Sequence, residues 1–164
     1  MILPQSPSFR LDGKRALVTS SGTDRVAVVD LDKLVAMLKS ATPRERERVI
    51  PNHTGKPAEY VIQHIPTQTT PRGITLSADG ATAYVASMLD DSVTVIDVKK
   101  LAALGGIDLG GAKELSQRRR GERLFHSANV AFRRQFSCSS CHPDGHIDNI
   151  VYDIEDDGVG MGPI

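Results

Sequence analysis

The sequence predicts a mixed fold in which two repeated units of short antiparallel β-strands precede a small, mainly helical segment. Three observations lead to this prediction. Residues 13–34 resemble residues 80–101, glycines cluster between residues 105 and 111, and a Cys-x-x-Cys-His motif occupies residues 138–142. The repeated stretches are rich in β-branched residues, which favours strands. The glycine cluster predicts a boundary between the two parts.

The composition excludes several classes of protein. The chain has 164 residues, with 20 Lys and Arg balanced by 20 Asp and Glu, so no net field attracts nucleic acid or an anionic membrane. No apolar stretch approaches the ~20 residues of a membrane-spanning helix. We therefore expect no nucleic-acid partner and no membrane span. The N-terminus shows no charged region followed by an apolar run, so the sequence carries no visible signal peptide.

The internal repeat is strong for a chain of this length. Residues 13–34 align without a gap with residues 80–101, and ten of the 22 aligned positions are identical. Apolar runs alternate with turn residues in each copy, which indicates strands joined by hairpins. The expected strands are 8–11, 15–20, 26–30 and 59–65 in the first unit and 73–77, 82–87 and 93–97 in the second.

Four short antiparallel strands per repeat are the architecture of a β-propeller blade. Blades usually recur every ~40–45 residues, whereas Gly13 aligns with Gly80, so the first blade carries an insertion at about residues 35–57. Residues 31–39 within this region show helical spacing of apolar side chains. A closed propeller needs ~4–8 blades. We therefore expect an incomplete ring of about two blades, with the remaining blades missing, in a fragment of a longer protein.

The motif Cys138-Ser139-Ser140-Cys141-His142 contains the only two cysteines. This spacing is typical of covalent c-type haem attachment, in which two thiols form thioethers and the histidine ligates the iron as proximal ligand. A redox dithiol and a zinc site are the alternatives. Zinc needs two further ligands, and the nearest spare one is His146.

Other residues are candidates for positions around a haem. Met161 is the candidate for the distal iron ligand, and its alternative is a residue in a glycine-rich tail. His146 follows His142 so closely that it stays on the proximal side, in a supporting or surface role. His126 belongs to an expected helix at 112–126, where it packs against a haem edge or ligates the iron. The arginines at 118–120, 123, 133 and 134 pair with haem propionates or form a solvated basic face.

These observations divide the chain into three parts. Residues 1–104 form the partial propeller, residues 105–113 the linker, and residues 114–164 the haem-binding segment, which we expect to be truncated.

Two stretches resemble known families. The first hundred residues resemble YVTN-type β-propeller repeats, with Tyr84-Val85-Ala86-Ser87 at the position of the name motif. Residues 120–148 resemble the haem domain of the di-haem cytochrome c peroxidase family, through Gly121-Glu122-Arg123-Leu124-Phe125 and the segment 136–146. The resemblance implies c-type haem, electron transfer and, in some members, peroxide reduction. A peroxidase of this type needs two haems, and this chain has one attachment motif, so that activity requires a second motif beyond residue 164.

The sequence thus predicts an electron-transfer protein that binds haem c through Cys138, Cys141 and His142. Its expected partner is a redox protein or a small oxidant such as peroxide. Haem c implies a periplasmic or other extracytoplasmic location, so we expect the natural N-terminus to lie upstream. The alternatives are a propeller-based binding protein with an accessory haem segment and a haem-free dithiol or zinc protein.

Overall fold

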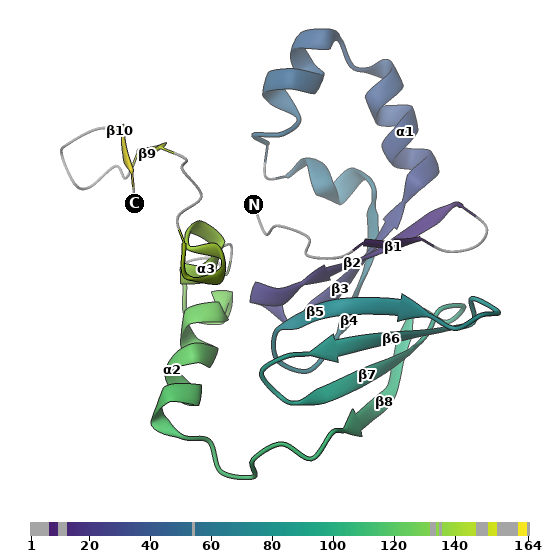
Figure 1. Ribbon diagram of the computed structural model, residues 1–164. Helices are drawn as coiled ribbons and strands as arrows, with labels where there is room; N and C mark the ends of the chain where they lie inside the picture. The colour runs from purple at the N-terminus through teal and green to yellow at the C-terminus, as the bar shows by residue number, and fades with distance from the viewer. Residues whose placement is uncertain are drawn as a thin grey trace.

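Two four-stranded antiparallel sheets form the body of the protein, and a helical segment lies along one end of both (Figure 1). The computed structural model describes residues 7–9, 13–53, 55–131, 134, 136–146, 151–153 and 161–163. No helix within these ranges is long and apolar enough to cross a lipid bilayer.

The first sheet has the strand order β1-β2-β3-β4, so each strand pairs with its neighbour in the sequence. The strands are β1 (Pro7–Phe9), β2 (Arg15–Ser20), β3 (Arg25–Asp30) and β4 (Val61–Pro66). The predicted strands lie within a few residues of these bounds, and β2 is predicted without error. Residue 11, which ends the first predicted strand, lies outside the described residues.

The second sheet repeats this arrangement in the order β5-β6-β7-β8. Its strands are β5 (Pro71–Leu76), β6 (Thr82–Ser87), β7 (Ser92–Asp97) and β8 (Ala102–Asp108). Residues 105–108, which the sequence places in the linker, pair with β7, so that part of the predicted linker is wrong. Pairing with β7 satisfies the backbone groups along one edge of this glycine-containing strand. Each repeat is therefore a four-stranded meander, the strand arrangement of a propeller blade.

Equivalent positions of the two repeats adopt equivalent backbone conformations. The β2–β3 turn ends at Asp24 and the β6–β7 turn ends at Asp91, and both residues have positive φ, 54° and 45°. Asp tolerates this left-handed conformation better than most residues. The register also shifts between Val28 and Val29 in one sheet and between Val95 and Ile96 in the other, at aligned positions. The repeat seen in the sequence is thus a repeat in structure.

The insertion between β3 and β4 is largely helical. It begins with α1 (Leu31–Ser40), where the Asp30 side chain accepts a hydrogen bond of 3.0 Å from the Lys33 amide and caps the helix. Two short helical segments follow, η2 (Glu45–Val49) and η3 (Lys56–Glu59). The α1 helix stands away from the sheets in Figure 1 and has no fully buried residue.

The C-terminal part contains α2 (Gln117–His126), η4 (Ala128–Val130), α3 (Cys138–Cys141) and η6 (Pro143–Gly145). Ser116 caps α2 by accepting a hydrogen bond of 3.2 Å from the Arg119 amide, so this helix begins later than the predicted residue 112. A two-stranded ribbon of β9 (Val151–Asp153) and β10 (Met161–Pro163) follows.

The core lies between the two sheets, where β2 and β5 run side by side. It contains apolar side chains from both sheets, and from the residue that follows β7, that are at most 1% exposed: Leu17, Val26, Val28, Ile65, Ala83, Val85, Ile96 and Val98. Burial alternates along β6, where Val85 is buried and Tyr84 is 38% exposed. One face of the second sheet therefore packs on the first sheet, and the other face is open.

The core predicts a large difference between two isoleucines of β4. Replacement of buried Ile65 (I65A) should lower the free energy of unfolding by about 2–5 kcal/mol, because it removes apolar contacts and leaves a cavity. Ile62 is 36% exposed, so I62A should cost about 1 kcal/mol or less. Urea denaturation followed by circular dichroism measures both values. Equal losses would contradict a shared core between the sheets.

Candidate functional site

The Cys-x-x-Cys-His motif forms a single helical turn. The backbone N–H of Ser137 donates a hydrogen bond of 3.0 Å to the Ser140 hydroxyl at the start of α3, and the His142 amide donates one of 3.0 Å to the Cys138 carbonyl at its end. Side chains three positions apart lie on the same face of a helix. The turn therefore presents Cys138 and Cys141 on one face.

Both cysteines are free thiols; Cys138 is exposed and Cys141 is half-buried. The described residues contain no group of three or more His, Cys, Asp or Glu side chains placed to hold a metal ion. Covalent attachment of a haem would need no such group, because two thiols would hold the ring and one imidazole would bind its iron. The two thiols and the imidazole are thus compatible with haem c.

The ring of His142 is oriented by the backbone that follows it. Its Nδ1 lies 3.2 Å from the carbonyl oxygen of His146. A carbonyl oxygen only accepts hydrogen bonds, so Nδ1 carries the proton and donates it. The lone pair of Nε2 is then available for a metal, and a hydrogen bond from the other ring nitrogen is the usual way a metal-binding histidine is held. The His146 side chain is exposed.

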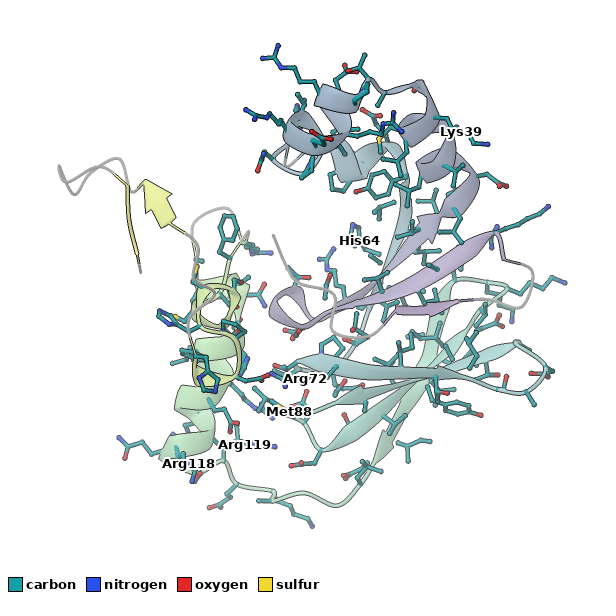
Figure 2. All side chains as sticks on the ribbon, turned by 45° about the horizontal axis from the view of Figure 1, so that its top comes forward. Lys39, His64, Arg72, Met88, Arg118 and Arg119 are labelled. Atoms are coloured by element: carbon teal, nitrogen blue, oxygen red, sulfur yellow. The ribbon has the colours of Figure 1, made fainter. Side chains whose placement is uncertain are left out.

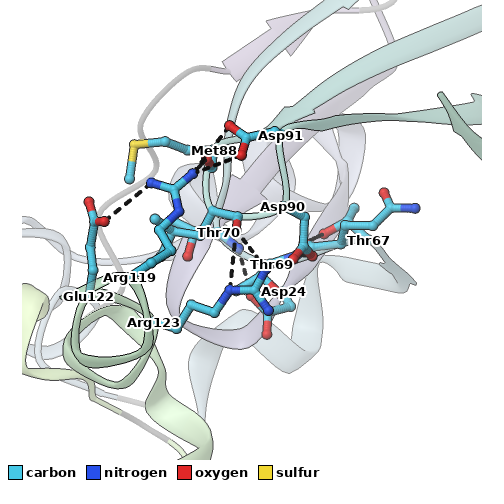
Figure 3. Close-up of polar contacts among 12 residues, drawn as sticks. Asp24, Thr67, Thr69, Thr70, Met88, Asp90, Asp91, Arg119, Glu122 and Arg123 are labelled. Carbon is cyan, nitrogen blue, oxygen red and sulfur yellow. Dashed lines mark hydrogen bonds and ion pairs between the residues drawn. The ribbon is translucent and has the colours of Figure 1, made fainter. Parts of the chain in front are cut away.

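Two arginines of α2 attach this segment to the second sheet (Figure 3). Arg119 donates a hydrogen bond of 2.9 Å to the Met88 carbonyl and pairs with Asp91 at 3.2 Å. Arg123 donates one of 2.7 Å to the Leu89 carbonyl and pairs with Asp90. Both guanidinium groups therefore satisfy carbonyls in the turn that joins β6 to β7.

The first sheet also contacts this segment, through its β2–β3 turn. A Cβ added to Gly22 in this turn would stand 3.5 Å from both the Ala128 Cβ and the Ser137 Oγ, which is ordinary van der Waals contact. Ala128 and Ser137 are both buried. The N-terminus of α3 therefore packs directly on the first sheet.

Asp24, at the end of that turn, links the first sheet to the chain that leads into the second. Its carboxylate accepts a hydrogen bond of 2.8 Å from the Thr70 amide. Burial raises the pKa of Asp24, although the bond from Thr70 opposes this effect. In the same region the Thr69 amide donates a hydrogen bond of 2.5 Å to Asp90, so the acceptor of Arg123 is fixed by the same connection.

His126 lies at the C-terminal end of α2 and is only 8% exposed. Its ring meets the Phe125 ring edge to face at a centroid distance of 5.3 Å. Burial lowers the pKa of His126, and the positive charge of Arg72 lowers it further. The surroundings therefore favour the neutral imidazole.

The remaining predicted residues have different outcomes. Met161 lies in β10, and its side chain is outside what the structure describes. Arg133 is also outside the described residues. Three large apolar side chains of the C-terminal part are substantially exposed: Leu124 (57%), Val130 (65%) and Phe136 (41%). Exposed apolar side chains of this kind are suitable for covering by a further apolar group.

The sequence does not predict the contacts by which α2 binds the β6–β7 turn. The sequence predicts that Arg119 and Arg123 bind propionates or are solvated, whereas in the structure both bind the β6–β7 turn. Their spacing of four residues places them on one face of α2. That spacing indicates that the two arginines bind the same part of the protein, but nothing in the sequence indicates which part.

The contacts between α2 and the β6–β7 turn predict that Arg123 contributes more to holding α2 in place than Arg118 does. Arg118 is exposed, and in Figure 2 it points away from the sheets. R123M should lower the protection of α2 amides against hydrogen exchange by about 10- to 100-fold, because hydrogen bonds to charged groups contribute about 1.5–3 kcal/mol. R118M should leave protection unchanged. Equal exchange in the two variants would show that α2 is held by other contacts.

The lowered pKa of His126 predicts loss of stability in mild acid. The unfolded chain binds a proton at His126 more tightly than the folded chain does. The contribution of neutral His126 to stability is therefore complete above the ordinary pKa of 6.5, and it is lost as the pH falls through the pKa of the folded state. H126Q should flatten the pH dependence of the urea midpoint below 6.5. Exposed His64 provides the matched control, H64Q, which should retain the wild-type profile. Identical profiles in wild type and H126Q would contradict this assignment.

No model of a known protein family matches the chain. Hydrazine synthase subunit beta from Kuenenia stuttgartiensis is 31% identical over 84 residues, which are 51% of this chain and 22% of that protein. Solved structures of other proteins resemble the chain over about two thirds of its length. Hydrazine synthase of Kuenenia stuttgartiensis has a TM-score of 0.47 at 19% identity, covering 65% of this chain and 23% of the other.

The second structure is the periplasmic gluconolactonase PpgL of Pseudomonas aeruginosa, with a TM-score of 0.47 at 23% identity, over 68% of this chain and 28% of the other. The third, described as a 6-phosphogluconolactonase of Bacteroides uniformis, has a TM-score of 0.42 at 19% identity, over 62% and 25% of the two chains. The chain therefore spans about a quarter of the length of the proteins it resembles.

Proposed function

We propose that this chain is an electron-transfer module that holds haem c covalently through Cys138 and Cys141, with His142 as the axial ligand. When bound, the haem would supply a carrier for one electron at a time. The protein would contribute two thioether attachments, an oriented imidazole and apolar surface around the ring.

One observation carries this proposal. The Nδ1 of His142 donates to the His146 carbonyl over 3.2 Å, directly beside two free thiols on one helical face. That hydrogen bond leaves Nε2 as the ligating nitrogen, whereas a simple dithiol makes no use of the tautomer of a neighbouring histidine. Leu124, Val130 and Phe136, exposed apolar side chains of the same C-terminal part, would be available to cover a bound ring.

The two sheets are, in this proposal, blades of a larger β-propeller that carries the haem segment at one end. The open face of the second sheet supports this assignment, since Tyr84 and Ile107 remain 38% and 48% exposed there. A neighbouring blade would cover them. In this proposal the working protein lies outside the cytoplasmic membrane, where haem c would be attached.

A second candidate function is a binding subunit of a larger enzyme assembly. The 31% identity over 84 residues to a protein named as a subunit of hydrazine synthase favours it. A groove of about 410 Å³ between the second sheet and α2 offers a binding surface, lined by residues that include Leu89, Asp91, Ile107 and Leu115. In this role the haem segment would be accessory or would act as a haem-free dithiol.

The proposal predicts that the protein retains haem only when the thiols of Cys138 and Cys141 are present. After expression with haem-maturation machinery, the wild-type chain should retain haem through acid-acetone extraction and show a pyridine haemochrome spectrum, because thioethers resist extraction. The double variant C138S/C141S should retain no haem after this extraction. The control H146A should retain it, because His146 contributes its carbonyl and its side chain is exposed.

A colourless wild-type protein would contradict the electron-transfer proposal and favour the second candidate. Titration of thiols before and after mild oxidation would then test the dithiol alternative, since formation of a disulfide consumes both thiols. Dialysis against zinc with metal analysis would test the zinc alternative.

A further inference from the structure

The loop that follows the motif is attached to the second sheet by one ion pair. Within η6, Asp144 accepts a hydrogen bond of 2.8 Å from the Arg72 guanidinium. Arg72 belongs to β5, so the contact joins residues 72 positions apart in the chain. Figure 2 shows Arg72 extending from the sheet toward the C-terminal segment.

Arg72 itself is held where the two sheets meet. Its backbone carbonyl accepts a hydrogen bond of 3.0 Å from the hydroxyl of Thr19 on β2, and Thr19 is fully buried. The preceding residue, Pro71, is also buried. The Arg72 side chain is 28% exposed. The backbone that carries this guanidinium is therefore fixed by the cores of both sheets.

At its other end, the loop reaches the imidazole. Asp144 lies between His142 and His146, and the His146 amide donates a hydrogen bond of 3.0 Å to the Pro143 carbonyl. The His146 carbonyl then accepts from Nδ1 of His142 over 3.2 Å. This closed loop is short, so a rotation at Asp144 also moves the oxygen that holds the ring.

We propose that Arg72 and Asp144 are positioning residues for His142, because their ion pair fixes the loop whose carbonyl selects the Nδ1–H tautomer. The sheets thereby set the orientation of the axial ligand. The inference rests on the proposed function, in which His142 is an axial ligand. The contacts that support it involve only residues of this chain. Asp144 is 65% exposed, so the pair contributes little to overall stability, and its effect is local.

The test measures the tautomer of His142 in the haem-free, reduced chain. Long-range ¹H–¹⁵N spectra of histidine-labelled protein, at a pH where the ring is neutral, distinguish protonated from bare ring nitrogens. The wild type should be mainly Nδ1–H. R72M removes the donor, and D144N replaces the carboxylate by a neutral, weaker acceptor. In both variants the ratio of Nδ1–H to Nε2–H should fall by about 2- to 10-fold, a change of the size of one ordinary hydrogen bond.

A double variant separates a shared pathway from two independent effects. If Arg72 and Asp144 act through one contact, R72M/D144N should change the tautomer ratio no more than either single variant. The matched control is K56M, which breaks the ion pair of 2.7 Å between Lys56 and Glu59 in η3 and should leave the ratio unchanged.

Asn at position 144 tolerates the φ of 52°, so D144N should fold even if R72M does not. An unchanged ratio in D144N, or additive changes in the double variant, would overturn the inference. Failure of haem attachment would leave this readout intact, because it is made without haem. Haem attachment with an unaffected tautomer would overturn only the positioning role.

Discussion

The hydrogen bonds from Arg119 and Arg123 to the β6–β7 turn determine where the C-terminal segment stands. The carbonyls of Met88 and Leu89 lie just beyond the end of β6, where strand pairing has ceased. The guanidinium groups supply donors for these carbonyls and place α2 against the second sheet. Since α3 contacts α2, the Cys-x-x-Cys-His turn is held in a defined place relative to both sheets.

The two repeats show how similar units acquire different roles. Asp24 and Asp91 occupy aligned positions and share a left-handed backbone. Asp24 accepts from the Thr70 amide and so connects the first sheet to the second, whereas Asp91 pairs with Arg119 of α2. The same local geometry thus joins sheet to sheet in one copy and sheet to helix in the other.

Local patterns were sufficient for most of the fold. Both β2 and β6 have the predicted bounds, because β-branched runs between turn residues specify a strand without help from distant contacts. The sequence does not predict the β8 strand, because its two glycines, Gly105 and Gly106, favour a linker locally. Pairing with β7, which no local pattern reports, decided the outcome.

The candidate site was predictable in part for a related reason. Cys138, Cys141 and His142 are neighbours in the sequence, so their spacing alone placed them on one turn. The partners that orient this turn lie far away in the chain, as Arg72 does, and nothing in the sequence indicated them. Sequence patterns report chemistry within one segment, whereas the contacts that position the segment depend on the folded sheets.

The central claim is that Cys138 and Cys141 both form thioether bonds to one haem. Intact-mass spectrometry of denatured protein, purified after expression with haem-maturation machinery, tests it most directly. The account predicts a mass increased by one haem and no remaining reactive thiol. An unmodified mass with two reactive thiols would contradict it.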